Sequence, residues 1–329
     1  MKIAMLGFGS VGKGVYQACL DHQMFYASQY GVELEVEKVL VRRPHPMLGE
    51  RGVTTFEAIV DDPEIECVIE VMGGIQPAYS YISRALKAGK HVVSANKDLV
   101  AEKGPELFEI ARNHRVKFCF EASVGGGIPV LYPLKSSLQA NRIESLSGIL
   151  NGTSNYILSR MQDDRLAFDE ALAQAQDLGY AERDPSADIS GLDAARKLVI
   201  LASLAWNKQF SLHHVRCQGI ETVRLDDLAE AKQQGETIKL VAEAMQASDG
   251  YRLSVGPKRI SSDHPLFMVS GVNNAVVVKG DLTGDVMFFG AGAGGQPTAS
   301  SVLSDVLNLA LNQAVQLTFS NEVPSVIGL

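Results

Sequence analysis

The chain has 329 residues, of which 46% are hydrophobic, and its formal net charge is −8. This length is enough for two domains, and the composition is that of a globular protein. The negative charge argues against a nucleic-acid or an anionic membrane partner. The four cysteines lack CxxC spacing, so neither a disulfide framework nor a zinc site is predicted. The N-terminal apolar run is too short for a signal peptide or a membrane span, and we expect a cytoplasmic protein.

The N-terminus combines a short apolar strand with a glycine-rich turn. Lys2–Leu6 is predicted to be a buried strand, and GFGSVG at residues 7–12 separates it from a predicted helix. Strand, G-x-G-x-x-G and helix in this order form the context of a dinucleotide fingerprint. Gly7 permits a tight turn, Gly9 lets the backbone approach a pyrophosphate, and Gly12 lets the helix pack on the strand. The alternative is a glycine-rich turn without a ligand.

A second strand, at about residues 35–41, ends at two arginines, Arg42 and Arg43. An NAD-selective site usually carries an acid at this place for the ribose 2′-hydroxyl, whereas arginine suits a 2′-phosphate. The arginines therefore favour NADP(H) as the cofactor, with NAD(H) as the alternative. The alternative is that both arginines are solvent-exposed residues of a loop and bind no cofactor.

The alternation of strands and helices continues to about residue 125. Three apolar segments, CVIEVMGG, HVVSANK and VKFCFEASVGGG, each run into small residues, and helices are predicted at 78–88 and 98–114. This pattern predicts a Rossmann-type, doubly wound parallel sheet, in which ligands bind at the carboxyl ends of the strands. Gly73–Gly74, residues 94–97 and residues 121–127 should therefore line one crevice.

After Pro129 the pattern changes to a second, α+β domain with an antiparallel sheet. We expect a strand near 143–150, a loop at 151–153, and helices near 168–178, 190–206 and 225–247. The strand candidates that follow are YRLSVGPKRI, HPLFMVS, AVVVKGD and DVMFFG. The predicted domains are a dinucleotide-binding domain at 1–128 and a domain for substrate binding and dimerisation at 129–296, with a C-terminal helix at about 297–318 that packs back near the first.

One segment of the second domain concentrates charge at the start of a very apolar helix. In LGYAERDPSADISGLDAARKL, Asp193 and Lys197 stand four residues apart on the stripe that continues through Ile200 and Leu204. Unpaired charges are costly to bury, so an acid and a base here require a reason. Two explanations remain open: a capping box at Ser190-x-x-Asp193 with an ordinary intrahelical ion pair, or a polar reaction site.

With these segments in order, the chain resembles homoserine dehydrogenase along nearly all its length. The matching motifs are GFGSVGKGV, EVMGG, AGKHVVSANK, FEASVGGGIPV, GILNGTSNYIL, LGYAERDPSADISGLDAARKL and FFGAGAGGQPTAS. The resemblance implies reversible, NAD(P)H-dependent reduction of L-aspartate 4-semialdehyde to L-homoserine, in threonine and methionine biosynthesis. It also implies a homodimer. The C-terminal ACT domain of many relatives is expected to be absent.

The resemblance also assigns roles to individual residues. It implies Lys197 as the acid/base, with Asp193 beside it and Lys97 near substrate and nicotinamide; which lysine donates the proton stays open. The implied substrate residues are Glu182, Gly152, Thr153, Tyr180 and Asp188. The implied cofactor residues are Gly7, Phe8, Gly9, Ser10, Val11, Gly12, Arg42, Arg43, Gly73, Lys97 and Gly292. The carbonyls of Glu121, Val124, Gly126 and Ile128 resemble a site for a monovalent cation such as Na⁺.

Two other functions are weighed against this one. An aspartate dehydrogenase would share the cofactor domain but lack the GYAE…D…GLDAARK cluster, which this chain has. A noncatalytic NAD(P)-sensing protein would keep the loop at residues 7–12 but need no lysine at both 97 and 197. Both lysines are present, which favours the dehydrogenase.

Overall fold

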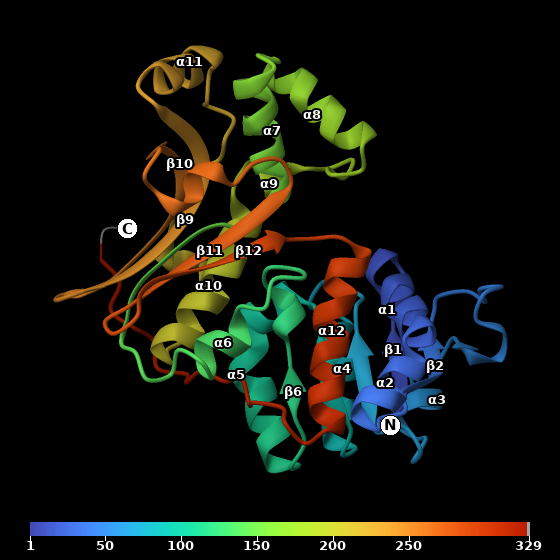
Figure 1. Cartoon of the computed structure of the whole chain (residues 1–329). Helices are drawn as coiled ribbons and strands as arrows, with labels where there is room; N and C mark the ends of the chain where they lie inside the picture. The colour runs from blue at the N-terminus through green and yellow to red at the C-terminus, as the bar shows by residue number, and fades with distance from the viewer. Residues whose placement is uncertain (328–329) are drawn as a thin grey trace. The chain divides into compact units, whose positions relative to one another are not determined.

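The computed structural model describes residues 1–327 and divides the chain into two compact units (Figure 1). The first unit comprises Met1–Ser136 and Ala293–Ser320, and the second begins at Ser137 and runs to Gly292, with the segment from Asn321 onward added to it. No helix of residues 1–327 is both long and apolar enough to cross a membrane. All four cysteines are free.

The first unit is built on a six-stranded sheet in the order β3-β2-β1-β4-β5-β6, and every neighbouring pair is parallel. This order is that of dinucleotide-binding doubly wound folds, so the predicted fold class is confirmed. The strands are β1 (Lys2–Leu6), β2 (Glu35–Leu40), β3 (Gly52–Val53), β4 (Cys67–Glu70), β5 (His91–Ser94) and β6 (Phe118–Cys119). The helices are α1 (Ser10–Asp21), α2 (Gln23–Tyr30), α3 (Glu57–Val60), α4 (Ala78–Lys87), α5 (Lys97–Asn113), α6 (Leu131–Lys135) and α12 (Gly295–Ala310).

Helix α12 comes from the C-terminal part of the chain and completes the core of the first unit. It lies beside α1 (Figure 1), and its Val302 and Val306 pack with Ile3 and Met5 of β1 and Val15 of α1. All five are fully buried. The helix ends at Ala310, earlier than the expected end near residue 318.

The first unit reaches beyond residue 128 because a buried carboxylate holds the next segment. The Glu121 side chain accepts three hydrogen bonds, from the backbone N–H groups of Val130, Leu131 and Tyr132, at 2.6–2.9 Å. These N–H groups belong to the start of α6, where an acceptor is needed because no intrahelical partner exists. The helix therefore packs with the first unit, and the division falls after Ser136.

The second unit contains a six-stranded sheet in the order β12-β11-β7-β9-β10-β8. All neighbouring pairs are antiparallel except β10 and β8. The strands are β7 (Ile143–Ile149), β8 (Val215–Cys217), β9 (Glu236–Ala247), β10 (Gly250–Ser261), β11 (Asn273–Gly280) and β12 (Gly284–Ala291). The helices are α7 (Gly152–Asp163), α8 (Phe168–Asp177), α9 (Ser186–Ile189), α10 (Leu192–Trp206) and α11 (Leu225–Gln233). Helices α7, α10 and α11 pack on this sheet, so the predicted α+β character is confirmed.

The expected helix at 225–247 is wrong over its second half. Helix α11 ends at Gln233, Gly235 adopts a φ of +75°, and β9 starts at Glu236. The segment ETIKLVAEAMQA is rich in residues that favour helices, but it lies between β7 and β10 and pairs with both. Tertiary pairing overrides local propensity here.

Two other expectations also fail. The segment HPLFMVS is not a strand, because Pro265–Met268 forms a 3₁₀ turn in which the His264 ring accepts a hydrogen bond from the Leu266 N–H. Residues 151–153 are not a loop, because Asn151 is the N-cap of α7 and the helix begins at Gly152.

Candidate active site

The glycine-rich turn between β1 and α1 has the geometry of a phosphate-binding loop. Gly7 has a φ of +105°, a conformation that side chains with a Cβ rarely adopt. A Cβ on Gly12 would lie 2.6 Å from the Gly7 carbonyl oxygen, so the helix can approach the strand this closely only with glycine. A Cβ on Gly9 would meet nothing within 4 Å. The space beside Gly9 and the start of α1 is therefore open to an anionic ligand.

Other proposed cofactor residues surround this turn. The Phe8 ring packs edge-on against the rings of Tyr16 and His45. Arg42 and Arg43 are exposed and follow β2, the parallel neighbour of β1. Since parallel strands end at the same edge of the sheet, the arginines lie at the edge where Gly7 begins the turn.

A buried carboxylate, which the sequence analysis missed, organises the next strand end. Glu70, the last residue of β4, is fully buried and accepts hydrogen bonds from Ser94 Oγ (2.6 Å) and the N–H groups of Met72 (2.8 Å) and Gly73 (3.1 Å). Burial raises the pKa of Glu70, and these hydrogen bonds oppose the rise. The carboxyl group fixes the turn at Gly73, which has a φ of +74°.

Lys97 is the first residue of α5, and Asn96 places it there. The Asn96 side chain accepts a hydrogen bond from the Leu99 N–H at 3.1 Å, which caps the helix. Its Nδ2 donates to the Gly74 carbonyl at 2.6 Å. The lysine thus follows a cap that is itself tied to the Gly73–Gly74 turn.

In the second unit, Lys197 and Asp193 form a buried ion pair within α10. Lys197 Nζ lies 2.6 Å from Asp193 Oδ2 and donates a second hydrogen bond, at 2.7 Å, to the Leu150 carbonyl. The two residues are 9% and 7% exposed. The capping box expected at Ser190 is absent: α10 follows Gly191, which has a φ of +82°, and no side chain caps the helix. Asp193 is therefore not part of a helix cap, and its ion pair with Lys197 is not on the surface.

Asn151 joins this ion pair to a second carboxylate. Its Nδ2 donates to Asp188 Oδ1 at 2.7 Å and to Asp193 Oδ2 at 2.9 Å, while its Oδ1 accepts from the Ser154 N–H at the start of α7. Burial, together with the nearby charge of Asp193, raises the pKa of Asp188. Sequence reasoning missed Asn151 because the motif NGTS was predicted to be a loop.

The remaining candidate substrate residues lie near the start of α7. Thr153 Oγ1 donates to the Tyr180 carbonyl at 2.7 Å, and the Tyr180 ring packs 5.1 Å from that of Tyr156. These contacts bring the segment around Tyr180 to the first turn of α7. Glu182 follows on the same segment and is exposed, so its carboxylate is accessible to a ligand.

The loop at residues 121–128, which is predicted to bind a cation, is almost entirely buried and contains backbone carbonyls that can act as ligands. Glu121, Val124 and Ile128 are at most 2% exposed, and Gly126 has a φ of +57°. The Gly126 carbonyl accepts one hydrogen bond, from Ser301 Oγ at 2.6 Å. A carbonyl has two lone pairs, so this bond leaves one for a ligand. No cluster of three or more His, Cys, Asp and Glu residues suited to a metal occurs in residues 1–327.

The C-terminal glycine cluster falls on both units. A Cβ on Gly295 would lie 2.9 Å from the Ser10 carbonyl, and one on Gly14 would lie 2.6 Å from the Gly295 carbonyl, so α1 and α12 begin in close contact. Gly292 belongs to the second unit, where it packs against the side chain of Asn274.

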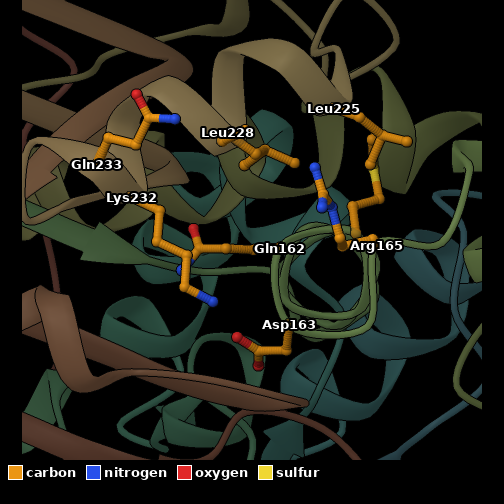
Figure 2. A pocket seen from close by; sticks show the side chains of 9 residues that line it. Gln162, Asp163, Arg165, Leu225, Leu228, Lys232 and Gln233 are labelled. Atoms are coloured by element: carbon orange, nitrogen blue, oxygen red, sulfur yellow. The ribbon is translucent and has the colours of Figure 1, made fainter.

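A pocket in the second unit lies away from the candidate substrate residues of the same unit (Figure 2). It forms where the end of α7, including Gln162 and Asp163, faces Leu225, Leu228 and Lys232 of α11. The candidate substrate residues lie at the first turn of α7, whereas the pocket lies at its other end. A helix of twelve residues is roughly 18 Å long. The pocket is therefore not the candidate active site.

Comparison with known proteins gives one consistent result. A family model described as homoserine dehydrogenase matches residues 129–307, and one described as homoserine dehydrogenase, NAD binding domain, matches residues 7–121. The homoserine dehydrogenase of Synechocystis sp. is 49% identical over 318 residues, which cover 94% of this chain and 73% of the relative. That of Bacillus subtilis is 40% identical over 323 residues, with 97% and 75% covered.

Solved structures agree. A homoserine dehydrogenase from Thiobacillus denitrificans matches with a TM-score of 0.91 and 39% identity, over 97% of this chain and 77% of that one. A hyperthermophilic archaeal homoserine dehydrogenase in complex with NADPH matches with a TM-score of 0.79 and 26% identity, over 96% of this chain and 99% of that one.

Proposed function

Because the chain belongs to the homoserine dehydrogenase family and has homoserine dehydrogenase activity, we propose that Lys197 is the group that exchanges the proton in this reaction. The observation that carries the proposal is the buried ion pair: Lys197 Nζ is held by Asp193 Oδ2 and the Leu150 carbonyl. An ammonium has three donors, so these two bonds leave the third N–H for the reacting oxygen.

Lys197 acts as a general acid when the aldehyde is reduced. When bound, the nicotinamide cofactor supplies the hydride. As charge develops on the aldehyde oxygen, the Lys197 ammonium stabilises it and then donates a proton. Asp193 holds the ammonium in position, and Asn151 holds Asp193. In the opposite direction the neutral amine accepts the proton of the homoserine hydroxyl. Lys97 is assigned an electrostatic role beside substrate and nicotinamide.

The amino-acid end of the substrate needs partners for an ammonium and a carboxylate. We assign the ammonium to Glu182, with Asp188 as a further acid. The carboxylate is assigned to the N-terminus of α7, where the N–H groups of Gly152 and Thr153 favour an anion. The contact between Thr153 Oγ1 and the Tyr180 carbonyl supports this assignment, because it ties the loop carrying Glu182 to the same helix end.

For the cofactor, we propose NADP(H) in preference to NAD(H). The open space at Gly9 and the start of α1 suit the pyrophosphate. Exposed Arg42 and Arg43 at the end of β2 suit a 2′-phosphate. The domain roles follow, with the dinucleotide on the first unit and the substrate on the second.

We also propose a monovalent cation, such as Na⁺, at the carbonyls of Glu121, Val124, Gly126 and Ile128. Oxygen-only coordination suits a hard cation. Its chemistry would be structural, fixing the loop that leads from β6 to α6.

A homodimer is proposed through the second unit. Strand β12 is an edge of its sheet, and Met287 and Phe289 are 38% and 55% exposed on one face of that strand. An exposed edge with apolar side chains needs a cover, which a second copy would provide. Sedimentation of the wild type and of Phe289→Glu tests this, because the variant should be monomeric.

One assay tests the cofactor and substrate proposals together. Oxidation of NADPH and of NADH is followed by loss of nicotinamide absorbance, with aspartate semialdehyde as the second substrate. A higher kcat/KM with NADPH supports the proposal, whereas a higher value with NADH contradicts it.

A further inference from the structure

Asn274, the second residue of β11, is buried, and its side-chain amide lacks hydrogen-bond partners among the described residues. It is 1% exposed, and among the described residues neither its Oδ1 nor its Nδ2 has a hydrogen-bond partner. Buried polar atoms are rarely left unpaired, because their desolvation is costly. Both atoms of the Asn274 amide are therefore available for hydrogen bonds to a group outside the described chain.

The place that Asn274 occupies adds to this indication. A Cβ on Gly292 would lie 2.1 Å from Asn274 Nδ2, and a Cβ on Gly152 would lie 3.6 Å from Asn274 Oδ1. The amide is therefore in contact with Gly292 and faces the first residue of α7. Sequence reasoning assigned the first of these glycines to the cofactor and the second to the substrate.

The backbone that carries Asn274 is held firmly. Asn155 is fully buried, and its Nδ2 donates to the carbonyls of Val269 (3.3 Å) and Asn273 (3.1 Å). Ser159 Oγ accepts from the Gly271 N–H at 3.1 Å. Two residues of α7 thus fix the turn before β11, and the unpaired amide follows directly on this fixed segment.

The helix end that the amide faces has donors of its own. The first four N–H groups of a helix lack intrahelical partners. At α7, the Asn151 side chain accepts from the Ser154 N–H, and the Asn151 carbonyl accepts the first intrahelical bond, from the Asn155 N–H. Within residues 1–327 this leaves the N–H groups of Gly152 and Thr153, and their partial positive charge favours an anion.

We propose that Asn274 binds the α-carboxylate of the amino-acid substrate, with its Nδ2 donating to the anion that the α7 N-terminus attracts. The inference rests on the proposed substrate site. A half-turn of the amide exchanges Nδ2 and Oδ1 and breaks no hydrogen bond of the described chain, so Nδ2 can face Gly152. A neutral amide suits this place, because it adds a donor without adding a charge beside the Asp193–Lys197 pair.

The test uses Asn274→Asp and two alcohols, L-homoserine and L-homoserinamide, in which a neutral amide replaces the α-carboxylate. A carboxylate at position 274 repels the carboxylate of homoserine, so the KM for homoserine should rise roughly 100-fold, the size of a lost hydrogen bond to a charged group. The KM for homoserinamide should change less than fivefold, and that for NADP⁺ should stay the same. Asn273→Asp is the matched control, because it makes the same change one residue away, where the side chain donates to the Ser270 carbonyl.

A second variant, Asn274→Ala, guards against failure to fold. It removes two unpaired buried atoms, so the ligand-free protein should melt no lower than the wild type, while the KM for homoserine still rises at least tenfold. A purely structural Asn274 would lower the melting temperature and affect both alcohols equally. That result, or an effect confined to NADP⁺, would overturn the inference. Failure of the Lys197 proposal would instead appear in kcat, so the two are distinguishable.

Discussion

Replacing Lys197 by methionine separates a reaction site from an ordinary ion pair. Methionine keeps the unbranched shape of the side chain up to the position of Cε and removes the charged amine. A general acid contributes roughly 10²–10⁴-fold to the rate, so kcat should fall by this factor. At about 1.4 kcal/mol for each tenfold, the barrier rises by about 3–5 kcal/mol. A pair that serves only the helix would leave kcat almost unchanged.

The same substitution has a cost in stability that follows from burial. Because Lys197 and Asp193 are 9% and 7% exposed, Lys197→Met leaves a buried carboxylate without its ammonium. Breaking such a pair costs about 3–5 kcal/mol, far more than the roughly 0.3–0.5 kcal/mol of a surface pair on a helix. The double variant Lys197→Met/Asp193→Asn removes both charges and keeps an oxygen that can accept from Asn151 Nδ2. It should recover most of the free energy of unfolding and none of the activity.

The assays are urea unfolding and steady-state turnover with homoserine and NADP⁺. Lys239→Met is the matched control, because it also removes a lysine that is 4% exposed, on β9 of the same unit. Its kcat should equal that of the wild type. A folded Lys197→Met protein with turnover within tenfold of the wild type would refute the assignment, and Lys97 would then be the lysine to test.

Three further predictions concern other residues. Arg42→Ala should raise the KM for NADPH roughly 10–100-fold and that for NADH less than threefold, because a charge-assisted contact to the 2′-phosphate contributes about 1.5–3 kcal/mol. Equal effects on the two KM values would show that Arg42 does not bind the 2′-phosphate. Gly9→Ala should unfold like the wild type yet weaken NADPH binding in titrations, whereas Gly12→Ala should lower the melting temperature, because its Cβ would lie 2.6 Å from the Gly7 carbonyl. Burial lowers the pKa of Lys239 to about 8 from 10.5, although the charge of Asp163 opposes the shift. Between pH 8 and pH 10.5 the unfolded state therefore binds more protons than the folded state, so the free energy of unfolding rises with pH from about 8 to 10.5. In urea unfolding, Lys239→Met should abolish this rise and increase the free energy of unfolding at pH 7 by up to about 3 kcal/mol.

The sequence was sufficient where a local pattern and the tertiary structure agree. The parallel sheet of the first unit follows from apolar segments that end in glycine and small residues. Gly7 has the positive φ, and Gly12 the close approach to Gly7, that their motif requires. Residues 236–247 show the opposite case. Their alanines, glutamates and lysine favour a helix, but pairing with strands on both sides makes them β9. Gly235 is a local signal for the end of α11, but the pairing that makes the next residues a strand has no local signal.

The residues that connect distant segments of the site were harder to predict than those that stand within a recognisable motif. Glu70 stands within the apolar segment CVIEVMGG, and its role depends on Ser94, which is 24 residues away. Asn151 bonds to Asp188 and Asp193, which are 37 and 42 residues away. A side chain that acts by bridging distant segments has no periodicity or spacing of its own, so only the folded chain reveals it.

Three consecutive residues that follow β7 supply three different groups to the candidate substrate site. The Leu150 carbonyl accepts from Lys197 Nζ, the Asn151 amide donates to Asp193, and Gly152 begins α7. Their position is fixed by a strand with neighbours on both sides, since β7 pairs with β9 and β11. A one-residue slip of β7 would turn its side chains to the opposite face of the sheet and move all three groups together. The candidate substrate site is therefore attached to an interior strand of the sheet, where such a slip is least tolerated, and Lys197 is held by the carbonyl of the residue that directly follows this strand.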